Sequence, residues 1–481
     1  MLTLVNTNRM VPPIAPLGLE YVAEAARRSG VAVEVLDLSL AADPLEALRS
    51  HFGSSSPTLV GLSFRNADDS YWPSAQSFVA DLAELVRELR GLTDAPLVVG
   101  GVGFSIFAVG IASQLGVDFG IRGDGEHAIV RLYEELGGAR RFERVPGLLW
   151  REEWSVRANA PAWPEELTLP NRRDVLDNAT YFGRGGQVGL ETKRGCDRMC
   201  AYCADPLAKG ARVRTRAPAE VAGEAEALLR QGVDVLHLCD SEFNIPLRHA
   251  LAVCEELVRR NLGERLRWYA YLATTPFTPE LARAMRRAGC AGINFTGDSA
   301  SPAMLETYGQ PHGREALAEA VRLCRENEIA VMVDLLLGGP GETPETAAEI
   351  VELVKHIGPD CAGAALGLRL YPGTAITGQL LAAGPLEINP GIWRRYEGPV
   401  DFLLPTFYLS PDLGSQPARL VRDLVAGDPR FFEPADPDAA EEPAKDHNYN
   451  QNEELVRAIA SGARGAYWDI LRRMRGRPGS T

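Results

Sequence analysis

Two series of short apolar runs, each alternating with amphipathic stretches, constrain the fold of this chain more than any other feature. The first series occupies residues 1–140. Strands are predicted there over 2–6, 32–37, 59–64, 97–99 and 116–121, and helices over 17–29, over 74–92 and from about residue 126. Strands that alternate with helices at this interval indicate a doubly wound, Rossmann-like parallel α/β sheet. Ligands of such sheets bind beyond the carboxyl ends of the strands.

A second alternating series runs from about residue 186 to 380. Its predicted strands are 188–192, 235–239, 267–271, 291–296, 330–337 and 364–371, with helices such as 217–231, 279–288 and 314–327 between them. Residues 141–185, rich in Trp, Pro and Arg, are expected to form a linker with a small hairpin around 146–156. Residues 381–481 are expected to form a small, mainly helical cap that ends in one helix over 452–475.

Three cysteines, Cys196, Cys200 and Cys203, lie in one short run. Gaps of three and then two residues let their thiolates converge on one small volume. Closely spaced thiolates hold iron–sulfur clusters, and three of them leave one iron open to a substrate or cofactor. Structural zinc usually takes four ligands in two pairs, and no second pair or suitably spaced histidine lies nearby. The five other cysteines are expected to be buried core residues.

This cysteine spacing, with Tyr202 directly before the last cysteine, resembles the radical S-adenosylmethionine superfamily. The resemblance implies a 4Fe–4S cluster whose open iron chelates S-adenosylmethionine. It implies one-electron cleavage of that cofactor to a 5′-deoxyadenosyl radical. It also implies that residues 186–380 form a partial (β/α)6 barrel with catalytic residues at the carboxyl ends of its strands.

Further contacts to S-adenosylmethionine follow from the resemblance. Glu242, after the second barrel strand, falls where the superfamily holds the methionyl ammonium, which suits a charge-assisted hydrogen bond. Asp298 and Ser299, after the fourth strand, fall where relatives contact the ribose and carboxylate. Tyr202 would lie beside the adenine. Arg369, at the end of the sixth strand, either binds a cofactor carboxylate or pairs within the barrel.

The first domain resembles the cobalamin-binding domain that precedes the barrel in one large subgroup, the class B radical methyltransferases. The matching runs are 13–21, 98–105 and 122–126. Gly100, Gly101 and Gly103 directly follow a predicted strand, where glycine lets the backbone approach a flat macrocycle closely. The resemblance therefore implies cobalamin as a further cofactor.

One departure from the cobalamin pattern concerns the metal. The Asp-x-His-x-x-Gly motif that supplies a cobalt ligand in many cobalamin proteins is absent. Several members of the subgroup lack it and place a non-coordinating residue at the lower face of the metal. Arg65, at the end of a predicted strand, is the candidate here. The alternative is that Arg65 pairs with Asp68 or Asp69 and shapes the loop.

Few residues are candidates for substrate chemistry. Tyr308 and Glu342 are the predicted catalytic residues, as acid or base groups at the barrel mouth. Further candidates are His312, Tyr371, Tyr408, His447 and Tyr449. A lone His or Tyr in a loop is more often structural, because only convergence with a perturbed partner makes a site. The run 446–450 either covers the substrate pocket or caps the final helix through Asn450, and we expect the helix cap.

Composition and charge restrict the partners. A formal net charge of −14 argues against nucleic acid and anionic membranes as general partners. No apolar stretch is long enough to cross a bilayer, and no signal peptide is visible. We expect a cytoplasmic enzyme with a small-molecule substrate and an external electron donor, such as a flavodoxin, a ferredoxin or a reductase.

The resemblance implies two candidate reactions. The first is cobalamin-dependent methylation of an unactivated carbon of a small specialised metabolite, for instance an antibiotic precursor. In it, one S-adenosylmethionine supplies the methyl group by way of cobalt, and the radical from a second removes a substrate hydrogen. The alternative is a cobalamin-independent radical dehydration, deoxygenation or rearrangement of a sugar or an aminoglycoside-type intermediate. A carrier of electrons or cobalamin without catalysis is disfavoured by the open iron.

Overall fold

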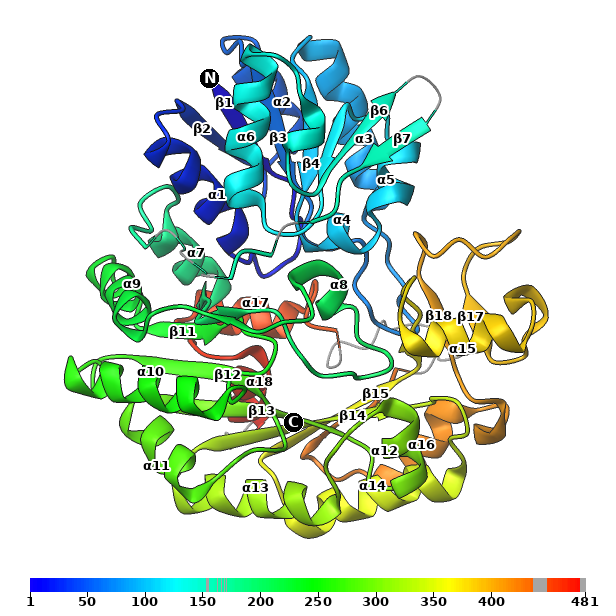
Figure 1. Ribbon diagram of the computed structural model, residues 1–481. Helices are drawn as coiled ribbons and strands as arrows, with labels where there is room; N and C mark the ends of the chain where they lie inside the picture. The colour runs from blue at the N-terminus through cyan, green and yellow to red at the C-terminus, as the bar shows by residue number, and fades with distance from the viewer. Residues whose placement is uncertain are drawn as a thin grey trace.

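The computed structural model describes residues 1–152, 155–161, 163–165, 167, 169, 171–435 and 448–475. These residues form two α/β bodies, the first stacked on the second, with a small antiparallel sheet beside the join (Figure 1). Both bodies contain a seven-stranded sheet. The expected order of a doubly wound domain followed by a parallel barrel is confirmed.

The first sheet has the strand order β2-β1-β3-β4-β5-β6-β7. Its parallel strands are β1 (Leu2–Asn6), β2 (Val33–Asp37), β3 (Leu59–Ser63), β4 (Leu97–Gly100) and β5 (Phe119–Ile121). Its helices are α1 (Leu17–Arg28), α2 (Pro44–Phe52), α3 (Val79–Leu92), α4 (Val102–Ile106), α5 (Ala108–Gln114) and α6 (Gly125–Gly137). Helices α1 and α6 share one hydrophobic core with the sheet, and α2, α3 and α5 share another, so both faces are covered.

Four helices of this body differ from the prediction: α2, α4 and α5 were not predicted, and α3 begins later. Helix α2 was missed, although Asp43 caps it by accepting from the backbone N–H groups of Leu45 and Glu46. Helix α3 begins later than expected because the preceding residues fold back on Asp69. That carboxylate accepts from Ser74 Oγ at 2.5 Å and from Gln76 N at 3.1 Å.

The segment expected to be a linker is partly sheet. β6 (Leu148–Glu152) and β7 (Ser155–Ala158) form the predicted hairpin, and β6 pairs antiparallel with β5. The first sheet therefore extends beyond residue 140. Strand–helix alternation does not reveal such an extension, because an antiparallel edge needs no crossover helix. Helix α7 (Asn178–Gly185) then leads into the second body.

The second body is an open parallel barrel with the strand order β8-β11-β12-β13-β14-β15-β19. Six of its strands are β8 (Val188–Leu190), β11 (Val235–Leu238), β12 (Arg267–Ala273), β13 (Cys290–Asp298), β14 (Ala330–Leu337) and β15 (Cys361–Leu366). Its helices are α9 (Pro218–Arg230), α10 (Leu247–Arg259), α11 (Pro279–Arg287), α12 (Pro302–Tyr308), α13 (Arg314–Glu326) and α14 (Pro344–Ile357). The short elements β9 (Lys193–Arg194), α8 (Asp205–Lys209) and β10 (Arg214–Thr215) follow β8. The expected sixth strand is split at Gly367, which has a φ of +86°.

The C-terminal part is divided between three places. β16 (Leu368–Arg369), β17 (Ile392–Arg394) and β18 (Thr406–Tyr408) form the small sheet, with α15 (Ala375–Ala383) beside it. Helix α16 (Pro417–Val425) leads to β19 (Phe431–Phe432), which adds a parallel strand to β15. The last elements are α17 (Glu453–Ala460) and α18 (Tyr467–Arg475).

The prediction of one final helix is wrong. The chain breaks between α17 and α18 at Gly462 and Gly465, which have φ values of +97° and +139°. Asn452, not Asn450, caps α17, because its Oδ1 accepts from Leu455 N at 2.9 Å. Asn450 instead accepts from Val11 N at 3.1 Å and contacts the first body.

Candidate cluster and cofactor site

The three cysteines lie in the loop between β9 and α8, beyond the carboxyl end of β8. All are free thiols. Burial raises the pKa of Cys200 to about 12, and the nearby Asp298 and Cys196 act in the same direction. The pKa of Cys203 is also raised, by burial and by Asp205, Cys200 and Cys196. The three thiols are therefore neighbours, as predicted.

The donor set fits a cluster better than a single ion. In the described part of the chain, no three His, Cys, Asp or Glu side chains are grouped to hold one metal ion. A 4Fe–4S cluster distributes its thiolate ligands over several irons. The loop is anchored for that purpose: Cys196 N donates to Gly210 O at 3.1 Å and Ala201 N donates to Tyr308 O at 2.8 Å.

A hydrogen-bond network joins the cysteine loop to the end of β13. Asp298 accepts from Tyr202 OH at 2.7 Å and from Gln310 Nε2 at 2.5 Å. Gln310 Nε2 also lies 3.5 Å from Cys200 Sγ. Burial raises the pKa of Asp298 to about 7. The predicted Asp298 and Tyr202 are thus brought together, and buried Ser299 follows Asp298 at the start of the α12 turn.

Glu242 lies on the same side of the barrel mouth. Its Oε1 accepts from Thr296 Oγ1 at 3.1 Å, whereas its Oε2 is buried without a hydrogen-bond partner. Burial raises the pKa of Glu242 to about 8, opposed by the nearby Lys193 and Arg198. Lys193 Nζ and Arg198 Nε are also buried without a hydrogen-bond partner. Such atoms are rare in proteins and fit a ligand that carries both an ammonium and a carboxylate.

Tyr308 and Glu342, the predicted catalytic residues, contact each other, and their catalytic role stays a prediction. Both side chains are fully buried, at 0% exposed. Tyr308 OH donates to Glu342 Oε2 at 3.1 Å and to Leu336 O at 3.0 Å, and accepts from Gly339 N at 3.2 Å. Burial raises the pKa of Glu342 to about 7. The pair braces the loop after β14, and the ring of Tyr308 also contacts Tyr202 of the cysteine loop at 5.8 Å between centroids.

Arg369 has a different partner from either expectation. Its guanidinium pairs with Asp68 of the first body at 2.8 Å, and both side chains are almost completely buried. It lies between the rings of Phe107 and Tyr371, at 5.4 and 5.1 Å from their centroids. Its remaining donors reach the carbonyl oxygens of Leu370 and Phe402. Arg369 is therefore an inter-body link and not a free cofactor ligand.

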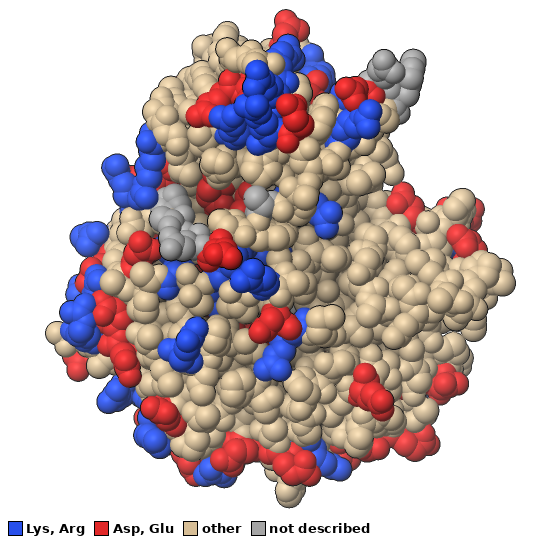
Figure 2. Space-filling view, in the orientation of Figure 1, with Lys and Arg blue, Asp and Glu red and all other residues tan. Residues whose placement is uncertain are grey.

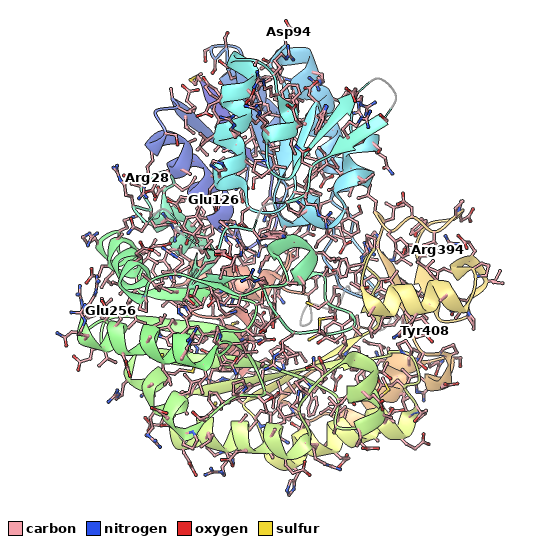
Figure 3. All side chains as sticks on the ribbon, in the orientation of Figure 1. Arg28, Asp94, Glu126, Glu256, Arg394 and Tyr408 are labelled. Carbon is pink, nitrogen blue, oxygen red and sulfur yellow. The ribbon has the colours of Figure 1, made fainter. Side chains whose placement is uncertain are left out.

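Residues 122–126 also contribute contacts between the first and second bodies. Glu126 accepts from Arg194 at 2.7 and 3.0 Å, and Asp124 pairs with Arg214. Figure 3 labels Glu126 at the lower edge of the first body, directly over the barrel. A motif that resembles part of a cobalamin-binding domain thus ties that domain to the cysteine-bearing loops.

Gly101 and Gly103 of the first body lie directly against the loop after β3. A Cβ on Gly101 would lie 2.5 Å from Phe64 O, and one on Gly103 would lie 3.0 Å from Ala67 N. The absence of a side chain therefore lets α4 pack on the loop after β3. Close approach of this backbone to a macrocycle stays a prediction.

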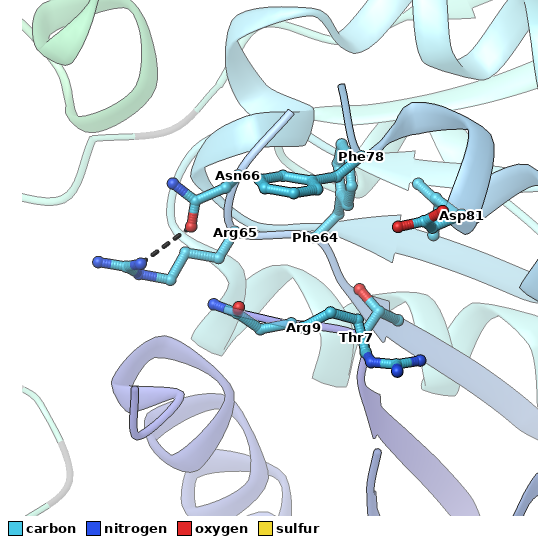
Figure 4. A pocket seen from close by; sticks show the side chains of 9 residues that line it. Thr7, Arg9, Phe64, Arg65, Asn66, Phe78 and Asp81 are labelled. Carbon is cyan, nitrogen blue, oxygen red and sulfur yellow. Dashed lines mark hydrogen bonds between the residues drawn. The ribbon is translucent and has the colours of Figure 1, made fainter. Parts of the chain in front are cut away.

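Arg65 is exposed and pairs with neither Asp68 nor Asp69; its Nη1 donates to Asn66 at 2.9 Å. Figure 4 shows its guanidinium pointing away from a crevice lined by Phe64, Phe78 and Asp81. That crevice has a volume of about 20 Å³, which suits a single water molecule. Arg65 reaches the barrel instead, where burial and its positive charge lower the pKa of His237 to about 4.

The remaining candidates are mostly structural. His312 Nε2 contacts Gly297 O at 3.2 Å, and Tyr371 OH contacts Ser70 Oγ of the first body at 2.8 Å. Tyr408 is buried in the small sheet. Tyr449 lies inside the barrel, where burial and the nearby Asp334 and Tyr271 raise its pKa. His447 lies outside the described residues.

Acidic and basic side chains are interspersed over the face shown in Figure 2, which has few charges around the small sheet. Among the described residues, no helix is long and apolar enough to span a membrane.

Free thiols at the mouth of an open parallel barrel, beneath a second α/β body, define the class of radical enzymes that use S-adenosylmethionine. Comparisons with known proteins agree. The Radical SAM superfamily profile matches residues 190–354, and the B12 binding domain profile matches residues 4–133.

Individual relatives narrow the class. The tryptophan 2-C-methyltransferase of Streptomyces laurentii is 31% identical over 506 residues, which covers 86% of this chain and 84% of that protein. An uncharacterised methyltransferase of Pyrococcus horikoshii is 26% identical, covering 79% of this chain and 81% of that protein. The solved TsrM methyltransferase of Kitasatospora setae, with tryptophan and a SAM analogue, has a TM-score of 0.88 at 32% identity, covering 98% and 99% of the two chains. The cobalamin-dependent enzyme OxsB shares the fold at a TM-score of 0.70 and 17% identity, over 85% of this chain and 64% of that chain.

This chain belongs to the cobalamin-dependent radical S-adenosylmethionine methyltransferases, the class B subgroup with an N-terminal B12-binding domain. The expected class of enzyme is confirmed, and methylation takes precedence over radical elimination or rearrangement. A small-molecule substrate fits this assignment.

Sequence reasoning missed several residues of the site. Gln310, Lys193 and Asp334 are single polar residues in ordinary-looking runs, and only folding brings them to the barrel interior. Asp68 was considered only as a partner of Arg65. An available signal was the alternation of polar with apolar residues along β13, which points Asn294 inward, and the single aspartate, Asp334, within the apolar run of β14.

Proposed function

We propose that this chain moves a methyl group from S-adenosylmethionine, by way of cobalamin, to a carbon of a small aromatic substrate of the indole type. The observation that supports the proposal is that the carboxyl ends of the strands in the first body face the carboxyl ends of the barrel strands. The loops after β3 and β4 face the mouth of the barrel, where the cysteine loop lies, and Arg65 reaches across. Parallel α/β sheets bind ligands at these ends, so the cofactors and the substrate meet in one place.

The residues present fit these cofactors. The three cysteines would hold a 4Fe–4S cluster, which supplies electrons. Glu242, whose Oε2 lacks a partner, would accept from the methionyl ammonium. Asp298 and Ser299 would contact the ribose and carboxylate, and Tyr202 would lie beside the adenine. Arg65 would face the lower side of cobalamin, which carries the methyl group when bound.

The indole class rests on two supports. Tryptophan is named for the similar methyltransferases of Streptomyces laurentii and Kitasatospora setae. The barrel interior of this chain also presents aromatic rings, with His237 and Tyr271 at 5.5 Å between centroids. We further assign an external electron donor of the flavodoxin or ferredoxin type and a cytoplasmic location, which suit an oxygen-sensitive cluster.

The test begins with cobalamin retention. The cluster is reconstituted without oxygen, hydroxocobalamin is added, and the desalted protein is examined by absorption spectroscopy. We expect near-stoichiometric retention, and transfer of label from methyl-labelled S-adenosylmethionine to tryptophan. Quantifying 5′-deoxyadenosine in the same reaction tells whether methylation consumes a radical. A protein that cleaves S-adenosylmethionine but retains no cobalamin contradicts the proposal.

Arg65 can be tested in the same assay. Replacement by Leu should change the spectrum of bound cobalamin or weaken its retention, because the residue nearest the lower face is altered. Arg9→Leu is the matched control, since Arg9 is an exposed arginine at the rim of the nearby crevice. Equal spectra for both variants would remove Arg65 from the site.

A further inference from the structure

The lower end of the barrel is closed by the C-terminal helices. Val235, Tyr269, Met332 and Cys361 point inward from the starts of their strands and form one hydrophobic cluster with Leu455, Ile459 and Trp468 of α17 and α18. Tyr269 OH donates to Asp469 at 2.8 Å. This group of residues is called the plug here. It limits any ligand to the part of the barrel between the plug and the cysteine loop.

The barrel interior is accessible directly above the plug. The next inward-facing residues along the strands are His237, Tyr271, Asn294, Asp334 and Gly363. Tyr271 pairs in register with Asn294, and Asp334 with Gly363. Side-chain contacts complete the layer, because Asn294 donates to Asp334 and the rings of His237 and Tyr271 are in contact. Tyr271 is 40% exposed although it lies in the middle of β12. This layer therefore lines a chamber.

Asp334 is the carboxylate of this chamber. Asn294 Nδ2 donates to it at 3.3 Å, and among the described residues no lysine or arginine acts on its carboxylate. A Cβ on Gly363 would lie 3.1 Å from Asp334 Oδ1, so the glycine leaves room for this side chain. An ionised carboxylate inside a barrel loses much of its hydration, and this raises its free energy unless a cation pairs with it.

The neighbouring carboxylates are committed elsewhere. Glu242 is bonded to Thr296, and Asp298 is bonded to Tyr202 and Gln310. Both lie nearer the cysteine loop than Asp334. Asp298 ends β13, one inward position beyond Thr296, the register partner of Asp334, and Glu242 lies in the loop after β11. The cations Lys193 and Arg198 also belong to that upper level, because both act on Glu242. Within the part of the chain that the structure describes, they leave Asp334 without a paired cation.

Aromatic rings flank the carboxylate. Tyr271 contacts His237 edge to face, and Tyr449 packs against Tyr467 at 5.7 Å between ring centroids. The chamber thus offers flat apolar walls together with one anionic group at its lower end. That combination suits an aromatic body that bears a protonated amine.

We propose that Asp334 binds the ammonium group of the methyl-accepting substrate and selects for amine-bearing aromatic molecules. This inference rests on the proposed function, because it places the methyl acceptor in the chamber between the plug and the cofactors. Asp334 acts by ion pairing with the substrate and leaves the reacting carbon to face the barrel mouth.

The test compares three indoles on the reconstituted, cobalamin-loaded enzyme. Dissociation constants are measured by calorimetry for tryptophan, tryptamine and indole-3-propionate, which lacks the amine. Replacing Asp334 with Asn should weaken tryptophan and tryptamine by about 10- to 100-fold, as expected for a charge-assisted hydrogen bond, and leave indole-3-propionate unchanged. Asp234→Asn, at an exposed position before β11, is the matched control and should change none of the three.

Several outcomes would overturn the assignment. Equal weakening of all three ligands by Asp334→Asn would indicate a structural role, and unchanged binding would remove Asp334 from the site. The affinities of the wild-type enzyme for the three indoles can be compared without any variant. This comparison therefore tests the inference even if Asp334→Asn fails to fold. A wild-type enzyme that prefers indole-3-propionate, or binds no amine, contradicts the inference. Label transfer from S-adenosylmethionine to cobalamin in that same enzyme would leave the proposed function standing.

Discussion

The strand-end loops of the first body and those of the barrel face each other, yet they use their polar side chains differently. In the first body, Asp68 and Glu126 are paired with arginines of the second. In the barrel, Lys193 Nζ and Glu242 Oε2 are buried without a hydrogen-bond partner. Motif residues of the first body thus hold the two bodies together, whereas these two charged groups of the barrel have no protein partner among the described residues.

Three carboxylates of the barrel also differ from the paired carboxylates of the first body. Burial raises the pKa values of Glu242, Asp298 and Asp334 to about 8, 7 and 6. None of the three has an arginine or lysine at hydrogen-bond distance among the described residues. Perturbed carboxylates cluster at functional sites because ligands, not protein cations, compensate them.

The largest expected effect tests the barrel side. Replacing Cys200 with Ala should abolish cluster assembly, methyl transfer and 5′-deoxyadenosine formation, because one iron loses its thiolate. Iron content and visible absorption after anaerobic reconstitution measure this. Cys324→Ala is the control, since Cys324 is a buried core residue of α13 and its loss should leave the cluster intact. A Cys200 variant that still assembles the cluster would contradict the site.

The next effect tests the join. Replacing Arg369 with Met leaves the Asp68 carboxylate buried and unpaired, which should lower the free energy of unfolding by about 3–5 kcal/mol. Thermal unfolding of the reconstituted enzyme measures it. Adding Asp68→Asn should recover part of the loss. Arg157→Met breaks an exposed pair with Glu152 and should have no measurable effect. Equal stability of Arg369→Met and Arg157→Met would show that the buried pair does not hold the bodies together.

A smaller effect concerns pH. Burial raises the pKa of Glu342 from 4.5 to about 7. The folded state therefore holds more protons than the unfolded state between these values, and stability should fall as the pH rises through that window. Glu342→Gln should flatten this dependence by on the order of 1–3 kcal/mol. Unfolding midpoints from pH 5 to 8 measure it, with exposed Glu264→Gln as control. If Glu342→Gln leaves the pH dependence of stability unchanged, a group other than Glu342 takes up the proton on folding.

The smallest effect separates two neighbouring asparagines. Asn452→Ala removes the cap of α17 and should cost about 1 kcal/mol of stability. Asn450→Ala should leave α17 intact and loosen the contacts with Val11 and Gln76 of the first body. Hydrogen exchange of α17 amides distinguishes the two variants. Faster exchange in the Asn450 variant would support the prediction from the sequence that Asn450 is the cap.

Much of the fold was predictable because local patterns report local structure. β1 over Leu2–Asn6 and β14 over Ala330–Leu337 fall where they were predicted, since buried parallel strands are continuous apolar runs. The break between α17 and α18 was missed because the hydrophobic pattern continues across it. The glycines that cause it have positive φ values only in the folded context.

The class of chemistry follows from the amino-acid sequence alone, because cysteine spacing brings thiolates together within one loop, whatever surrounds it. The order of the two α/β bodies follows from the sequence as well. The partners of four residues depend on the folded arrangement: Arg369, Tyr308, Glu342 and Asp334. These residues are far apart along the chain from the groups they face, so their roles depend on which strands and loops folding makes neighbours. The neighbours that folding supplies, and not the residue type, set whether a buried carboxylate braces a loop, as Glu342 does, or joins the two bodies, as Asp68 does.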